Sequence, residues 1–255
     1  MIQSKPWSLA IIVCLTLVRD GFVSGTIDLY DRGSNHRQDM EVVFNPSVNV
    51  VNTNVVNLKR WTLKLTNMAY SQPFGPIFIL GHNSSATPLF TIGNTSSKEL
   101  EFLAEHGSPE LLVKKYTNGF GVKATVTVGS PTEPLFPGKS IAFQFETSDT
   151  YPYISIATMA VNTNDCFAGF RKVQPHDNGF VVVSPGYDAG TEINDELCIH
   201  VPGPACLAYN QTHTDDDNGE GFIHVHRGIH GIGDLDASIY DWRNPMLQLQ
   251  IARVY

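Results

Sequence analysis

Charged residues are scarce in this chain. Asp, Glu, Lys and Arg make up 16% of the 255 residues, against about 25% in an average soluble domain. Acidic residues outnumber basic ones, so the formal net charge is −8 at pH 7, and no cluster of Lys and Arg is present to neutralise phosphates. This balance argues against a nucleic-acid partner. Hydrophobic residues reach 42%, which is enough for a buried core and argues against a disordered chain.

The sequence also lacks a hydrophobic run of membrane-spanning length. The apolar run near the N-terminus, SLAIIVCLTLV at 8–18, has about eleven residues, whereas a transmembrane helix needs about twenty. Lys5 precedes this run and the small residues Ser24 and Gly25 follow it, which is typical of a secretory signal peptide. We therefore expect residues 1–25 to be removed and the mature chain to be secreted, with no transmembrane segment. A buried strand or a short anchor is the alternative.

Cysteine is rare, with four residues in the chain. Cys14 leaves with the signal peptide, and Cys198 and Cys206 bracket a short loop rich in Pro and Gly. Because the export route is oxidising, a local Cys198–Cys206 disulfide is the economical interpretation. The spacing of the three remaining cysteines matches no zinc pattern. Cys166 is then either a small buried hydrophobic residue, which we favour, or an intermolecular thiol.

Three N-glycosylation sequons fit the same compartment. Asn83, Asn94 and Asn210 are each followed two positions later by Ser or Thr, with no Pro between. We expect these sequons to mark surface loops of a secreted glycoprotein.

Glycine and proline are frequent, with 21 and 15 residues, and favour many short strands over a few long helices. Apolar and polar residues alternate with a period of two in several segments, which indicates half-buried strands. Of two further segments, the first is mostly apolar and could be a central strand, and the second is a short apolar strand. The alternating segments are 59–67, 122–128, 141–146 and 247–251, and the apolar ones are 153–161 and 180–183.

One region has a helical pattern instead. Ser96 and Glu99 have the spacing of a capping box, and Gly107 ends the run that follows. Pro109 then favours the first turn of a second short helix. The sequence therefore predicts an all-β fold, an antiparallel β-sandwich with one helical insertion at about 97–117, preceded by an N-terminal extension at 26–57.

Three histidines lie close together near the C-terminal end. His224 and His226 share one face if the segment is a strand, and His230 follows four residues later. Three imidazoles could bind zinc, with Glu220 or Asp234 as a general base in a hydrolase. The alternative, which we favour, is that these imidazoles hydrogen-bond to loop groups and stabilise the Gly-rich turns.

A second group of polar residues is rich in oxygen ligands. Asp165 follows the apolar segment 153–161, and Asp188 and Glu192 follow the segment 180–187. If the two strands were neighbours, these carboxylates would converge on one hard cation, and calcium takes six to eight oxygen ligands. Spacing alone leaves open that Asn, Asp and Gly form turns here for their own reasons.

Five short segments complete the pattern. They are LTNMAYSQPFGP at 65–76, TNDCFAG at 163–169, YDAGTE at 187–192, GFIHVHRGIHG at 221–231 and YDWRNP at 240–245. Together and in this order they resemble the spondin N-terminal domain, which occurs in F-spondin, in mindin and in stand-alone secreted proteins. The resemblance runs from about residue 58 to 254, so we assign residues 58–255 to one spondin-like domain.

The resemblance implies an antiparallel β-sandwich similar to C2 membrane-binding domains, with one bound calcium ion. It implies Asp165, Asp188 and Glu192 as the calcium ligands, with Glu192 standing where F-spondin-like members carry Asp. It also implies binding to extracellular matrix or a cell surface, and no catalysis. We thus expect a secreted calcium-binding recognition or adhesion module whose partner is an extracellular protein, a glycan or a membrane surface. A secreted metal-dependent hydrolase that uses the three histidines is the alternative.

Overall fold

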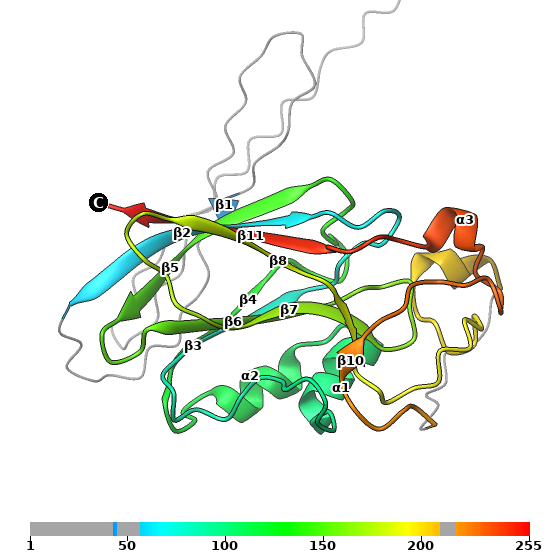
Figure 1. The fold of residues 1–255 in the computed structure, drawn as a ribbon, viewed down its shortest axis with the longest axis horizontal. Helices are drawn as coiled ribbons and strands as arrows, with labels where there is room; N and C mark the ends of the chain where they lie inside the picture. The colour runs from blue at the N-terminus through cyan, green and yellow to red at the C-terminus, as the bar shows by residue number, and fades with distance from the viewer. Residues whose placement is uncertain (1–42, 45–56, 210–217) are drawn as a thin grey trace, which may run out of the picture.

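Two β-sheets packed face to face form the body of the protein (Figure 1). The computed structural model describes residues 43–44, 57–209 and 218–255. The five-stranded sheet has the order β1-β5-β2-β11-β8, and the six-stranded sheet has the order β10-β9-β7-β6-β3-β4. All pairings are antiparallel except that of β1 with β5. The strands are β1 (Val43–Phe44), β2 (Leu58–Asn67), β3 (Ile77–His82), β4 (Val122–Val128), β5 (Ser140–Ser148), β6 (Tyr153–Met159), β7 (Cys166–Val173), β8 (Phe180–Ser184), β9 (Gly186–Asp188), β10 (His224–Val225) and β11 (Leu247–Val254). The expected all-β sandwich is confirmed.

The five-stranded sheet follows the alternation of its sequence. In β2, Trp61, Leu63 and Leu65 face the other sheet and are at most 1% exposed, while Thr62 and Lys64 between them remain partly exposed. Strands β5 and β11 flank β2 and show the same alternation over most of their length. Because each strand has only one buried face, the period of two in the sequence predicted these strands correctly.

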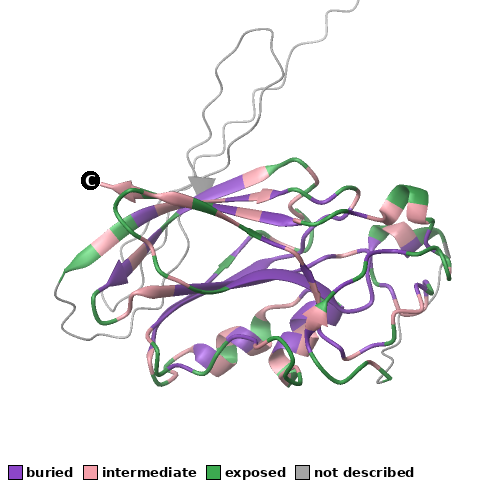
Figure 2. Cartoon of the chain, in the orientation of Figure 1, coloured by how far each residue is buried: buried purple, intermediate pink, exposed green. Residues whose placement is uncertain are grey.

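The six-stranded sheet is buried on both faces. In β3, Ile79 packs into the core between the sheets, whereas Phe78 and Leu80 pack into a second core on the opposite face. Two helices cover that second core, and in Figure 2 the strands above them are mostly buried. A strand buried on both faces has no polar side, so the sequence of β3 shows no alternation.

The covering helices are α1 (Lys98–His106) and α2 (Glu110–Tyr116), which confirms the expected helical insertion. The expected capping box at Ser96 is wrong by one residue. The N-cap is Ser97, which has an extended backbone and whose side chain accepts a hydrogen bond from the Leu100 N–H. Gly107 ends α1 in the left-handed region, with φ of 65°, as expected. A 3-10 helix, η1 (Pro204–Tyr209), and a short helix, α3 (Ala237–Tyr240), were not expected.

The cysteines are arranged as expected. Cys198 and Cys206 form a disulfide, and Cys166 is a free, fully buried residue. Asn83 and Asn94 lie in surface loops. The third sequon, the expected signal peptide and most of the expected N-terminal extension lie outside the described residues.

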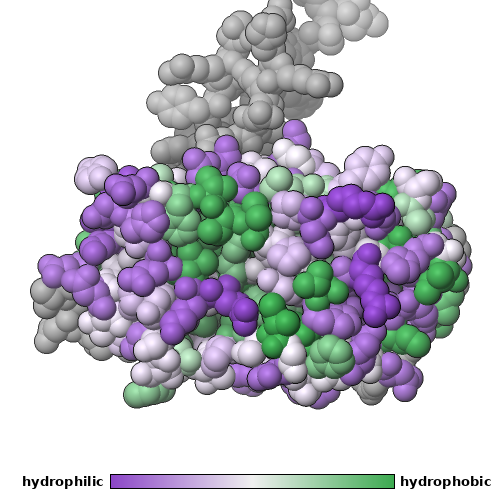
Figure 3. All heavy atoms as spheres, in the orientation of Figure 1, coloured by the Kyte–Doolittle hydropathy of each residue, from purple (hydrophilic) through white to green (hydrophobic). Residues whose placement is uncertain are grey.

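The surface carries scattered hydrophobic groups. On the face seen in Figure 3, hydrophobic side chains gather in separate patches among hydrophilic ones. Val181 and Val183 belong to β8, the last strand of the five-stranded sheet, and each is 52% exposed.

In the part of the chain that the structure describes, no helix has the length and apolar character to cross a membrane.

A buried histidine makes the stability of this fold depend on pH. His82 is 5% exposed, and its ring bonds to the carbonyl of Asn83 and the hydroxyl of Ser155. Burial lowers the pKa of His82 from its ordinary value of 6.5, and the charge of Lys172 lowers it further, against the opposing effect of the Asn83 bond. The unfolded chain therefore takes up this proton first, and stability is lost as the pH falls below 6.5.

We predict that His82→Gln makes this loss smaller, because glutamine does not titrate. The midpoint of thermal unfolding, measured from pH 7 to pH 5, should fall less in this variant than in the wild type. His176, which is exposed, provides the control. A His82→Gln profile that runs parallel to those of the wild type and of His176→Gln would contradict the assignment.

Candidate metal centre

The candidate site lies at one end of the six-stranded sheet, where β7, β9 and β10 meet. Strand β9 pairs with β7 on one side, with Asp188 opposite Cys166, and with β10 on the other, with Asp188 opposite His224. Asp188 therefore lies between the start of β7, which Asp165 directly precedes, and the histidine segment. The condition that segments 153–161 and 180–183 are neighbouring strands is not met, because they form β6 and β8 in different sheets. Strands β7 and β9 bring the carboxylates together instead.

Asp165 holds the loop that follows β9. Its carboxylate oxygen Oδ2 accepts hydrogen bonds from the backbone N–H groups of Thr191 and Glu192, at 2.8 and 3.1 Å, and from the Thr191 hydroxyl at 3.2 Å. The side chain is fully buried, and its other oxygen, Oδ1, has no hydrogen-bond partner. Glu192, on the same loop, is 1% exposed. One oxygen of Asp165 is thus used for structure, and the other is available to a ligand.

Asp188 is the second buried carboxylate, at 1% exposure. Its Oδ1 accepts a hydrogen bond from the Gly190 N–H, and its Oδ2 accepts one from the Asn194 side-chain amide, both at 2.7 Å. Burial raises the pKa of Asp188 to about 8, and the negative charges of Asp165 and Glu220 contribute. Burial also raises the pKa of Asp165. Both shifts show that the site disfavours the ionised carboxylates unless a cation is near.

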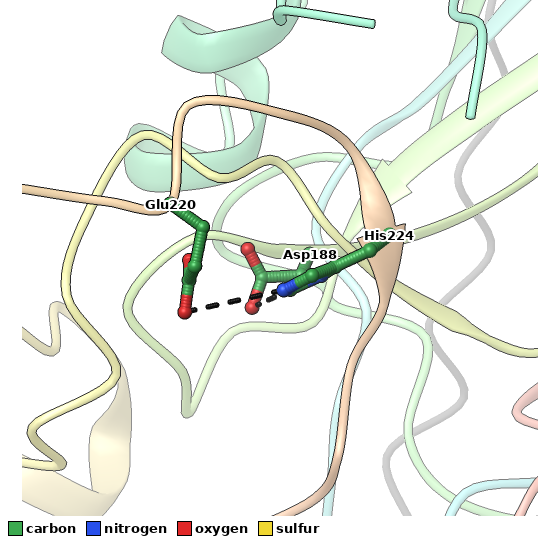
Figure 4. A group of neighbouring side chains, drawn as sticks. All are labelled: Asp188, Glu220 and His224. Atoms are coloured by element: carbon green, nitrogen blue, oxygen red, sulfur yellow. Dashed lines mark ion pairs between the residues drawn. The ribbon is translucent and has the colours of Figure 1, made fainter. Parts of the chain in front are cut away.

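Glu220 and His224 complete a cluster around Asp188, drawn in Figure 4. The His224 Nδ1 lies 3.8 Å from the Asp188 Oδ2, and the His224 Nε2 lies 3.9 Å from the Glu220 Oε1. One ligand atom from each of the three residues lies within 4.8 Å of the others. In the described part of the chain, this is the group with the spacing of a metal site, and it includes neither Asp165 nor Glu192.

The sequence assigned two of these residues to other roles. Glu220 was considered only as a base, and His224 was grouped with His226 and His230. The structure places His224 opposite Asp188 because β10 pairs with β9. No local sequence pattern groups Glu220 and His224 with Asp188, because their approach depends on the pairing of two strands that are distant in the chain.

The other two histidines have structural surroundings. The His226 Nδ1 accepts a hydrogen bond from the Gly228 N–H, so its Nε2 carries the proton and donates to the Asn194 side-chain oxygen. Burial lowers the pKa of His226 to about 3. His230 is exposed. Among the described residues the three imidazoles do not form one metal-ligand group, which removes the geometric basis for the tri-histidine site.

A hollow of about 230 Å³ opens beside the cluster. Asp188, Glu220 and His224 line it together with His226 and His230, so the cluster is accessible from solvent. His224 is 22% exposed and Glu220 is 41% exposed at their side chains. One buried carboxylate, one carboxylate at the rim and one imidazole are donors of the kind that hold a divalent cation.

Glu196 also lines the hollow and holds one wall of it, and nothing in the sequence pointed to this residue. This residue is 3% exposed, and its carboxylate accepts hydrogen bonds from three successive backbone N–H groups. The donors are His230, Gly231 and Ile232, at 2.6, 2.7 and 2.9 Å. In the sequence Glu196 resembles any acidic residue of a solvated loop, because its partners lie far along the chain.

Comparison with known proteins adds no assignment. Neither the protein-family models nor the curated proteins give a match to this chain.

We predict that Glu196→Gln lowers the free energy of unfolding by about 2 to 3 kcal/mol, because hydrogen bonds to a charged acceptor contribute about that much. The amide nitrogen of the glutamine would also face a backbone N–H group, from which it cannot accept a hydrogen bond. Urea denaturation measures the loss. Glu110→Gln, at an exposed position of α2, should change stability by about 0.5 kcal/mol or less. Equal stability of the two variants would show that Glu196 does not hold the wall.

Proposed function

We propose that this chain is a secreted calcium-binding module that recognises an extracellular partner, which is a protein, a glycan or a membrane surface. Calcium is bound by Asp165, Asp188 and Glu192 and has a structural role, and the module catalyses no reaction. The resemblance to the spondin N-terminal domain supports this proposal, and so does the burial of all three carboxylates at one end of the sandwich.

The observation that carries the proposal is the state of Asp165. A fully buried carboxylate oxygen without a hydrogen-bond donor costs more than a neutral orphaned group, which itself costs about 1 to 3 kcal/mol. The neighbouring Asp188 adds a second buried carboxylate to the same region. A divalent cation compensates both costs at once. Carboxylate and backbone carbonyl oxygens are the ligands that calcium prefers.

Export to an oxidising compartment is supported by independent features. The Cys198–Cys206 disulfide is of a kind that forms in secreted proteins. The sequons at Asn83 and Asn94 lie where an attached glycan would project from the surface. The apolar run at 8–18 supplies the expected secretion signal.

We predict that calcium raises the melting temperature of the wild type. An ion at 100 times its dissociation constant stabilises the folded state by about 2.7 kcal/mol, which corresponds to about 5 to 10 °C for a domain of this size. Asp188→Asn should abolish most of this rise.

The control is Asp177→Asn, at an exposed position paired with Arg253. This variant should keep the full calcium response. Melting curves that respond to neither calcium nor chelator, from a sample in which metal analysis finds no calcium, would defeat the proposal.

A further inference from the structure

We propose that Asp188, Glu220 and His224 form a second cation site that takes a transition-metal dication, with Zn²⁺ as the expected ion. This site lies beside the proposed calcium site and shares Asp188 with it. This inference rests on the proposed function only through the shared residue Asp188, and either proposal can fail while the other holds.

The donor set argues for a transition metal. Calcium takes oxygen ligands, whereas imidazole nitrogen suits zinc, copper, iron and nickel. Zinc accepts both histidine nitrogen and carboxylate oxygen. The cluster supplies one imidazole and two carboxylates from residues whose ligand atoms already lie within 4.8 Å of one another.

The distances between the ligand atoms are those of a site that must contract when an ion binds. Bonds of 2.0 to 2.2 Å in a tetrahedron place neighbouring ligand atoms about 3.3 to 3.6 Å apart. The two measured approaches of His224 involve different nitrogens, Nδ1 at 3.8 Å from Asp188 and Nε2 at 3.9 Å from Glu220. With one ligand atom from each residue, all three lie within 4.8 Å of one another, so they must approach by up to about 1.5 Å when an ion binds. Both approaches of His224 are also too long to be hydrogen bonds, so the cluster is not held by its own members.

The surroundings of the His224 Nδ1 indicate that this nitrogen is the one that binds the ion. It is buried and has no hydrogen-bond partner, although it faces the Asp188 carboxylate. A ring uses only one nitrogen for a given ion, so Glu220 must move its carboxylate from Nε2 towards the Asp188 side. Glu220 lies at the rim with 41% of its side chain exposed, and a long exposed side chain can make that movement.

Asp188 is held in a position from which it can serve both sites. A carboxylate has about four lone-pair positions, so Oδ2 can face His224 while it accepts the Asn194 amide hydrogen bond. Asn194 is oriented in turn by His226, whose ring packs at 5.1 Å from that of Trp242. Partners of this kind fix metal ligands in place, and their loss typically weakens metal binding.

The second site would not be closed. Glu220 and His224 line the hollow, so an ion bound there keeps positions open to water or to a group of a binding partner. The ion is therefore exchangeable, in contrast to one held by the fully buried Asp165.

The test uses the secreted chain without a histidine tag, stripped of metal and then saturated with calcium. Co²⁺ serves as the spectroscopic probe, and Zn²⁺ affinity is measured by its displacement of Co²⁺. We expect one Co²⁺ per chain. His224→Ala should weaken binding by about 100-fold or more and Glu220→Gln by about tenfold or more, since even the loss of a supporting residue costs 10- to 100-fold.

The matched control is His230→Ala, because His230 lines the same hollow but lies outside the cluster. It should bind Co²⁺ like the wild type. If His224→Ala also binds like the wild type, or if both histidine variants lose binding equally, the second site does not exist and the metal binds surface histidines.

Calcium responses separate the two proposals. The melting temperature of His224→Ala should still rise with calcium, and this rise also shows that the variant folds. If His224→Ala does not fold, His224→Asn is used in its place. Asp188→Asn should lose both the calcium response and Co²⁺ binding. Co²⁺ binding that depends on His224, in a protein whose melting ignores calcium, would overturn the proposed function and leave the second site standing.

Discussion

The hydrogen bonds that the Asp165 carboxylate accepts from Thr191 and Glu192 hold this end of the sandwich together. They fix the loop after β9 against the start of β7, and so determine where Asp188 and Glu192 lie. A carboxylate is a costly residue to bury, and here its cost is only half compensated, because one oxygen has three donors and the other has none. The structure of this end and its proposed affinity for a cation thus have one origin.

The rest of the site is supported from outside the sheet. Asn194 and His226 orient Asp188 on one side of the hollow, and Glu196 ties down the chain at His230 on the other. Both sets of hydrogen bonds come from residues in loops, and each loop is held in place by buried polar groups that have hydrogen-bond partners. Loops held in this way can position ligands on a rigid β-scaffold without belonging to it.

The sequence predicted those parts of the fold whose signals are local. The alternation of Trp61, Leu63 and Leu65 predicted β2 because only one of its faces is buried. Strand β3 was not predicted, because the helices bury its second face and remove the polar half of the pattern. Asp165 and Asp188 were identified as neighbours through the wrong strands, since sheet membership is decided by packing over the whole chain. The approach of Glu220 to Asp188 is likewise a product of β9–β10 pairing, which no local pattern contains.

The placement of Cys166 has a consequence for oxidative folding. Cys166, Cys198 and Cys206 all belong to the core between the two sheets, and a thiolate at Cys166 would be able to attack the bridge while the chain folds. Burial raises the pKa of the Cys166 thiol well above its ordinary range, and the charges of Asp188 and Asp165 raise it further. Only the thiolate attacks a disulfide, so among the described residues the folded state keeps Cys166 unreactive towards the Cys198–Cys206 bridge. The carboxylates of the candidate metal centre thus also help to keep the Cys166 thiol protonated.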